Sequence, residues 1–145
     1  MPEILELLAS PVHRFEGRPS DGAAPAPPGE LVTSVRIRAG LGIVGDRYFG
    51  HPAHRDASVT VIAQEGLPAG PGVSAVGLAA VRRNVLVSGI DVDGLVGAVL
   101  SLDSGDGPVR LQVTSRAHPC AWTDVTVGPG AWQAMRGKAA SAAGR

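Results

Sequence analysis

Glycine and proline interrupt this chain so often that few windows remain in which a long helix could form. The 145 residues include 20 glycines and 12 prolines, and the stretches between them are short and rich in valine. Both residues are unfavourable inside helices, whereas short β-branched runs between turn residues are typical of strands. We therefore predict a mostly β fold with tight turns and short helices. The length fits one domain with a continuous core.

The apolar runs indicate where the elements of this fold lie. Residues 4–9 fit helical and strand spacing equally well. Residues 104–108 are turn-forming and stand between two alternating runs, which predicts a hairpin. Residues 130–135 suit one or two helical turns after a proline. Strands are predicted at residues 31–38, 58–63, 81–87, 98–102 and 109–114.

Two segments are predicted to lie outside the packed core. Residues 18–30 are rich in proline and poor in large apolar side chains, so we expect a surface loop there. Residues 138–145 are small and polar and have little to bury, which predicts a flexible tail. A single domain is accordingly expected over residues 1–137.

The charge pattern excludes several classes of protein. The formal net charge is zero, with 13 basic and 13 acidic residues and no long run of either sign. A nucleic-acid-binding surface normally carries a basic stripe, so no nucleic acid is expected as a partner. No apolar run is long enough for a membrane span. The first residues lack the pattern of a secretory signal, and one reduced cysteine fits the cytoplasm.

Cys120 is the only cysteine and the strongest candidate for a chemical role. It follows Arg116, His118 and Pro119, so two groups able to carry positive charge lie within four residues of it. Nearby positive charge favours the thiolate, which is the nucleophilic form of cysteine. A thiolate is also a good ligand for a soft or high-valent metal. One cysteine can form no internal disulfide, so the alternatives are a buried small side chain or the working atom of a site.

The glycine-rich segment at residues 40–45 matches the G-x-G-x-x-G pattern of dinucleotide-binding proteins. In that motif the third glycine opens a helix. Here Gly50 and Pro52 follow too closely for one to form. We interpret the segment as a glycine-hinged loop that presents Asp46 and Arg47. Such a loop binds anions through backbone N–H groups and an arginine.

Arg82, Arg83 and Asn84 lie in the strand predicted at residues 81–87, which is otherwise apolar. Two interpretations stay open for them. They form either a solvated strand end or a clamp for a phosphate or carboxylate, since arginine supplies paired donors and asparagine adds an amide.

Four short motifs follow one another along residues 31–137: Gly-Ile-Val-Gly-Asp-Arg at 42–47, Arg-Asn-Val-Leu-Val-Ser-Gly-Ile at 83–90, Leu-Val-Gly at 95–97 and Arg-Ala-His-Pro-Cys at 116–120. In this order they resemble the MOSC domain. This module is found at the C-terminus of molybdenum cofactor sulfurases and as small stand-alone bacterial proteins. Each motif alone is weakly specific, but four motifs in this order around a single Pro-Cys pair are more specific.

The resemblance implies a barrel-like fold whose cysteine handles sulfur or binds molybdenum cofactor (molybdopterin). In the first version Cys120 takes sulfur as a persulfide from a pyridoxal-phosphate-dependent cysteine desulfurase and passes it to a molybdoenzyme, with no tightly bound pyridoxal phosphate in this domain. In the second version Cys120 is a molybdenum ligand in an enzyme that reduces N-hydroxylated compounds. The residues it implies are Cys120, Arg116 and His118 for the chemistry, and Arg82, Arg83, Asn84, Asp46 and Arg47 for the cofactor or sulfur donor.

One departure from the family pattern bears on assembly. Typical MOSC domains continue beyond the position of residues 136–137 with a Gly-Gly segment and a strand that ends in a Gly-Asp pair, and this chain has neither. The resemblance then implies that the family's final strand is missing and that a sheet edge is open to a homodimer partner. Two other function classes stay open: a non-catalytic module that binds a pterin-like anion or a protein, and a cysteine nucleophile of unrelated chemistry.

Overall fold

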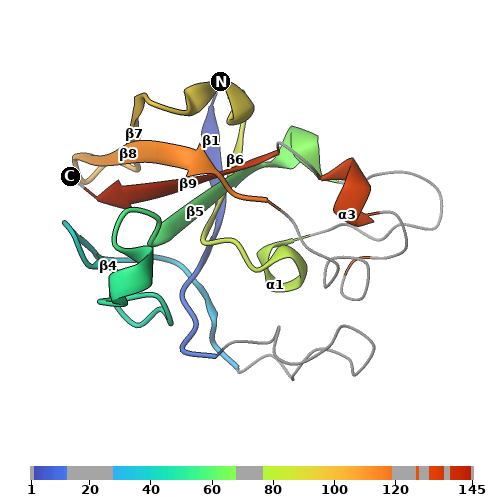
Figure 1. Cartoon of the computed structure of the whole chain (residues 1–145). Helices are drawn as coiled ribbons and strands as arrows, with labels where there is room; N and C mark the ends of the chain where they lie inside the picture. Colours follow the sequence, from blue (N-terminus) through green and yellow to red (C-terminus); the bar gives the residue numbers. More distant parts are fainter. Residues whose placement is uncertain are drawn as a thin grey trace.

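The computed structural model describes residues 2–12, 28–67, 77–118, 127, 131–135 and 138–144. They form a seven-stranded mixed sheet with the order β2-β1-β6-β5-β9-β8-β7, and a separate two-stranded sheet of β3 and β4 (Figure 1). The strands are β1 (Glu3–Leu8), β2 (Leu31–Val32), β3 (Ile37–Arg38), β4 (Gly42–Ile43), β5 (Val59–Ala63), β6 (Val85–Ser88), β7 (Val99–Asp103), β8 (Pro108–Arg116) and β9 (Ala139–Gly144). The short helices are η2 (Pro52–His54), η3 (Gln64–Gly66), α1 (Leu78–Val81), η4 (Asp93–Leu95) and α3 (Ala131–Ala134). The mostly β prediction is confirmed.

Several elements lie where the sequence predicted them. β7 and β8 form the expected antiparallel hairpin, with Leu100 opposite Leu111. β5 occupies the predicted run, and the ambiguous residues 4–9 are the strand β1. The prediction of one continuous strand at residues 31–38 was wrong. The segment forms two short strands with different partners, because β2 pairs with β1 whereas β3 pairs with β4. The strand predicted from residue 81 begins only at Val85, because a turn of helix precedes it.

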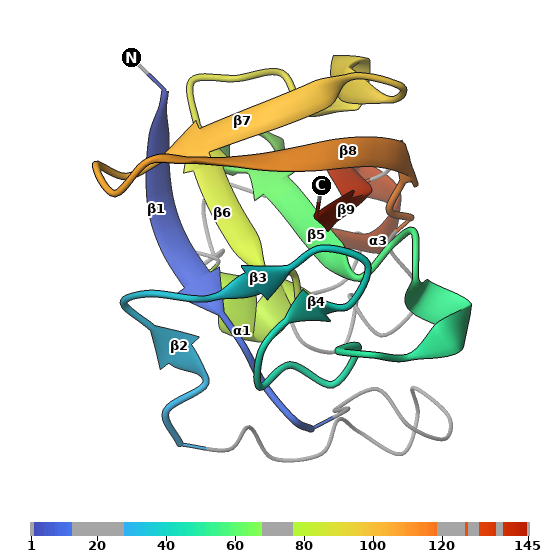
Figure 2. The same ribbon diagram turned by 90° about the vertical axis from the view of Figure 1, so that its left-hand side faces the viewer.

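The sheet curves strongly without closing on itself. Figure 2 shows β7 and β8 running across the direction of β1 and β6. The edge strands of the order are β2 and β7, and no pairing joins them within the described ranges. The fold is therefore an open, curved sheet rather than a closed barrel.

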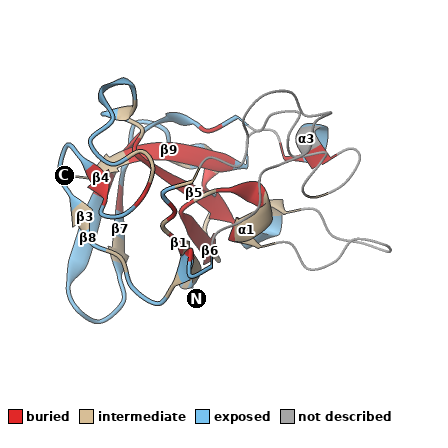
Figure 3. Cartoon of the chain, turned by 90° about the horizontal axis from the view of Figure 1, so that it is seen from below, coloured by how far each residue is buried: buried red, intermediate tan, exposed pale blue. Residues whose placement is uncertain are grey.

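Two apolar clusters lie on opposite faces of this sheet. β5 is buried along its whole length, so its alternate residues contribute to both clusters (Figure 3). The inner cluster includes Val59, Val61, Val85 and Leu111. The outer cluster contains Ile62 and Leu86 together with residues of α1 and α3. The near-continuous apolar run of β5 follows from burial on both faces.

The C-terminal segment corrects the sequence prediction most clearly. Residues 138–145 were expected to be a flexible tail, but Ala139–Gly144 form β9, which lies between β5 and β8 in the sheet. Ala140 pairs with Val61 on one side and Arg116 on the other. Ala139, Ala140 and Ala142 are at most 3% exposed. Small side chains suit a strand covered on both faces, and backbone pairing on both sides stabilises it. The domain therefore extends beyond residue 137.

No helix within the described residues is long and apolar enough to cross a bilayer.

Candidate functional site

Cys120 itself lies outside the residues that the structure describes, but the segment that leads to it is defined as far as His118. After β8 ends, the Ala117 N–H donates to the carbonyl of Ala139 at 2.9 Å. Nη2 of Arg83 donates to the His118 carbonyl at 3.0 Å and lies 3.5 Å from the Ala117 carbonyl oxygen. The structure therefore brings together Arg83 and His118, two of the residues implied by the family resemblance. The contact runs through the His118 backbone, and the His118 residue is exposed.

Arg116 is oriented by an acidic partner. Its Nε lies 2.8 Å from Oδ1 of Asp93 in η4. The two side chains are 53% and 43% exposed. Solvent screening limits such a pair to about 0–1 kcal/mol. Arg116 therefore remains accessible to an anion from solution, although that anion must compete with Asp93 for the guanidinium group.

Asn84 has a structural role that the sequence analysis did not anticipate. It is 1% exposed. Its Nδ2 donates to the Leu8 carbonyl at 3.1 Å, and its Oδ1 accepts from the Thr60 N–H at 3.0 Å and from Thr60 Oγ1 at 3.2 Å. These bonds join the end of β1, the start of β5 and the approach to β6. The side chain expected to contact a pterin phosphate is instead buried among protein partners.

Arg82 is likewise held inside the fold. It caps α1 in the left-handed conformation with φ 58°, and its N–H donates to the Leu78 carbonyl. Nη1 pairs with Oε1 of Glu30 at 2.5 Å, and Nη2 donates to the Val12 carbonyl at 3.3 Å. Both charged side chains are about 95% buried. A buried charge is tolerated when it is paired in this way, so Arg82 fixes the chain near Val12 and Glu30.

Asp46 and Arg47 form a second buried pair, at 3.2 Å. Asp46 also accepts the Ser10 N–H at 3.1 Å, and Arg47 Nη2 donates to the Arg82 carbonyl at 3.2 Å. The segment that bears them was predicted to be an anion-binding loop. The structure agrees that no helix begins at the third glycine, because the next helical turn is η2 at Pro52–His54, but it turns the two side chains into the protein. Gly42 is required there, since φ is +114° and a Cβ would lie 2.8 Å from Ser58 Cβ.

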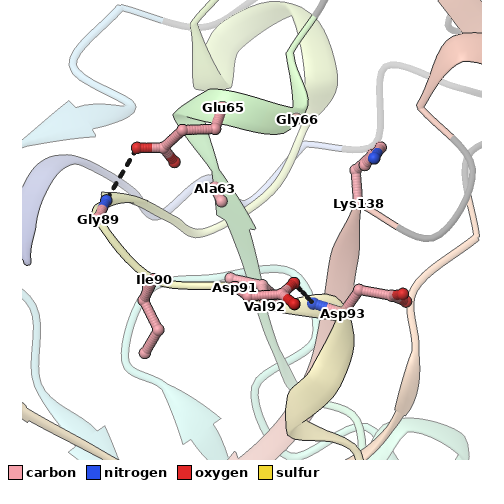
Figure 4. A pocket seen from close by; sticks show the side chains of 9 residues that line it. All are labelled: Ala63, Glu65, Gly66, Gly89, Ile90, Asp91, Val92, Asp93 and Lys138. Carbon is pink, nitrogen blue, oxygen red and sulfur yellow. Dashed lines mark hydrogen bonds between the residues drawn. The ribbon is translucent and has the colours of Figure 1, made fainter.

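A pocket of about 480 Å³ opens where β5 and β6 end and β9 begins (Figure 4). Its charged lining residues are Glu65, Asp91, Asp93 and Lys138. A carboxylate oxygen of Glu65 accepts the Gly89 N–H at 2.8 Å, and this bond lowers the pKa of Glu65 below its ordinary value. Sequence analysis missed these residues. No local pattern could have found them, because β5 pairs with β6, 24 residues further along the chain, and with β9, more than 70 residues further along.

The comparisons with known proteins define the fold alone. No family model matches the chain, and no curated protein matches it. A solved structure, the YuaD protein from Bacillus subtilis (APC1665), is similar with a TM-score of 0.65. The similarity covers 100% of this chain and 90% of that one, at 13% sequence identity. At 13% identity the similarity supports the same arrangement of strands but assigns no function to this chain.

Proposed function

We propose that this chain is a MOSC-type protein that carries sulfur as a persulfide on Cys120, in molybdenum cofactor sulfuration. The observation that supports it most is the bond from Arg83 to the His118 carbonyl. This bond places the Arg83 guanidinium beside His118, which lies two residues before Cys120 in the sequence. The order of the four motifs supports the same proposal. The expected setting is the cytoplasm, where a lone thiol stays reduced.

The proposed chemistry is a thiolate exchange. The Cys120 thiolate attacks the terminal sulfur of a persulfide on a cysteine desulfurase, so that a new S–S bond forms on Cys120. The donor S–S bond breaks, and the donor leaves as a thiolate. The terminal sulfur then passes to an acceptor that supplies two electrons, so that the S–S bond on Cys120 breaks and Cys120 is released as a thiolate. We propose that this acceptor is reduced molybdenum cofactor on a molybdoenzyme. Arg83 and Arg116 supply the positive charge that stabilises an anionic sulfur, and His118 lies beside them in sequence.

A resident molybdenum cofactor fits the described residues less well. Four residues proposed to hold it, Arg82, Asn84, Asp46 and Arg47, have buried side chains engaged by protein partners. The pocket at the end of β5 presents three carboxylates and one ammonium, which opposes the binding of a phosphate. We therefore propose the cofactor as the acceptor of sulfur, and we derive no step through a resident one.

The test is native mass spectrometry after incubation with a cysteine desulfurase, pyridoxal phosphate and L-cysteine. The wild-type protein should gain the mass of one sulfur atom, which dithiothreitol removes. Cys120→Ser should gain nothing while keeping its fold by circular dichroism. Sulfur retained on the serine variant would contradict the proposal. A pterin-sized mass in protein from a molybdenum-replete host would support the cofactor-holding version instead, and an unmodified wild-type protein would indicate a binding module.

A further inference from the structure

The pocket at the end of β5 is lined by charged residues of both signs. Figure 4 shows Lys138 at the start of β9 on one side and the loop with Asp91 and Asp93 on another. Glu65 from η3 lies on a third side with its carboxylate directed toward Gly89, and Ala63 lies between them. Charged side chains that line a concave surface fix the orientation of a small polar ligand.

The hydrogen bonds of this pocket preorganise its acidic wall. Oδ1 of Asp91 accepts the Asp93 N–H at 3.1 Å, and the Glu65 carboxylate is fixed by the Gly89 N–H at 2.8 Å. Asp93 shares its charge with Arg116. Lys138 is exposed, and within the described ranges no carboxylate lies in ion-pair distance of its ammonium. The pocket thus offers an acidic side with fixed oxygens and one cation available to a ligand.

We propose that this pocket binds a small zwitterion, a free α-amino acid with a neutral side chain. Its ammonium group contacts the Asp91 carboxylate, and its carboxylate contacts the Lys138 ammonium. The side chain lies against Ala63 and Val92. A volume of about 480 Å³ accommodates such a ligand with solvent to spare. This inference involves neither Cys120 nor sulfur transfer, so it stands apart from the function proposed above.

A divalent cation is the competing occupant of any acidic pocket. Among the described residues, however, no group of three or more His, Cys, Asp or Glu side chains has an arrangement that could hold a metal ion. Lys138, which lines the same pocket, further opposes a dication. A ligand with one positive and one negative group can pair with both the carboxylates and the ammonium group of the pocket, whereas an anion or a cation alone can pair with only one of them.

The test uses a matched series of ligands, measured by NMR titration of the full chain at low ionic strength. L-valine carries both charges, isobutylamine lacks the carboxylate, and isovalerate lacks the ammonium group. L-valine should bind with a dissociation constant on the order of millimolar. Each single-charge analogue should bind about tenfold or more weakly. Equal affinity for L-valine and isobutylamine would overturn the proposal, as would displacement of L-valine by stoichiometric Ca²⁺.

Two variants test which pocket residue binds the carboxylate of L-valine and which binds its ammonium group. Lys138→Met should weaken L-valine binding to the level of isobutylamine and leave isobutylamine itself unaffected, while Lys138→Arg should retain L-valine. Asp91→Asn keeps an oxygen for the Asp93 N–H but removes the charge, so it should weaken both ammonium ligands and spare isovalerate. If L-valine binds Lys138→Met as tightly as the wild type, the proposed orientation is wrong.

Discussion

Replacing Asn84 with alanine should destabilise the domain severely. The side chain is 1% exposed and makes three hydrogen bonds, to the Leu8 carbonyl and to the N–H and Oγ1 of Thr60. Each such bond contributes about 1–1.5 kcal/mol, and a buried group left unpaired costs at least as much. The expected loss is therefore about 3–5 kcal/mol of unfolding free energy. A domain of this size has roughly 5–15 kcal/mol in total.

Urea denaturation followed by circular dichroism measures this loss directly. The midpoint should fall with little change in slope, because the surface exposed on unfolding stays the same. Ser88→Ala is the matched control, since Ser88 lies on β6 and is only partly buried, and we expect a change within about 0.5 kcal/mol. If Asn84→Ala retained wild-type stability but lost affinity for phosphate or pterin anions, the structural role would be refuted and the ligand role supported.

Further predictions address the central strand, the cysteine segment and the acidic pocket. Ala142→Asp should abolish cooperative thermal unfolding, because it places an unpaired carboxylate at a 0% exposed position, at a cost of several kcal/mol; a wild-type melting curve would contradict the central place of β9. Arg83→Met should slow iodoacetamide alkylation of Cys120 several-fold at neutral pH, and Arg83→Lys should slow it less; unchanged rates for both would remove Arg83 from the site. Because the Gly89 N–H lowers the pKa of Glu65, that contact stabilises the fold above the ordinary carboxyl pKa and is lost as the pH falls through the lowered value. Glu65→Gln should therefore flatten the acid side of the curve of melting temperature against pH, and an unchanged curve would show that the bond contributes nothing.

The candidate site shows which residue roles a sequence pattern can predict and which it cannot. The polar run at residues 82–84 was predicted to be either a solvated strand end or an anion clamp, and neither describes the whole run. Arg82 and Asn84 are buried, whereas Arg83 reaches the carbonyl of His118, 35 residues further along the chain. A polar residue beside an apolar run has the same local pattern whether its partner is solvent, a ligand or a distant backbone group. The identity of that partner decides its role.

The sequence by itself determined the class of fold, the hairpin of β7 and β8 and the short turn of α3. These depend on local chemistry: turn residues between alternating runs, and a proline before a short helical pattern. Only the tertiary structure decided that Ala139–Gly144 form a strand inside the sheet and that Lys138 lines one pocket with Asp91 and Asp93. An alanine-rich hexapeptide has little strand preference of its own. Backbone bonds from β5 and β8 stabilise it, and those strands lie far from it in sequence, so no local window contains the cause.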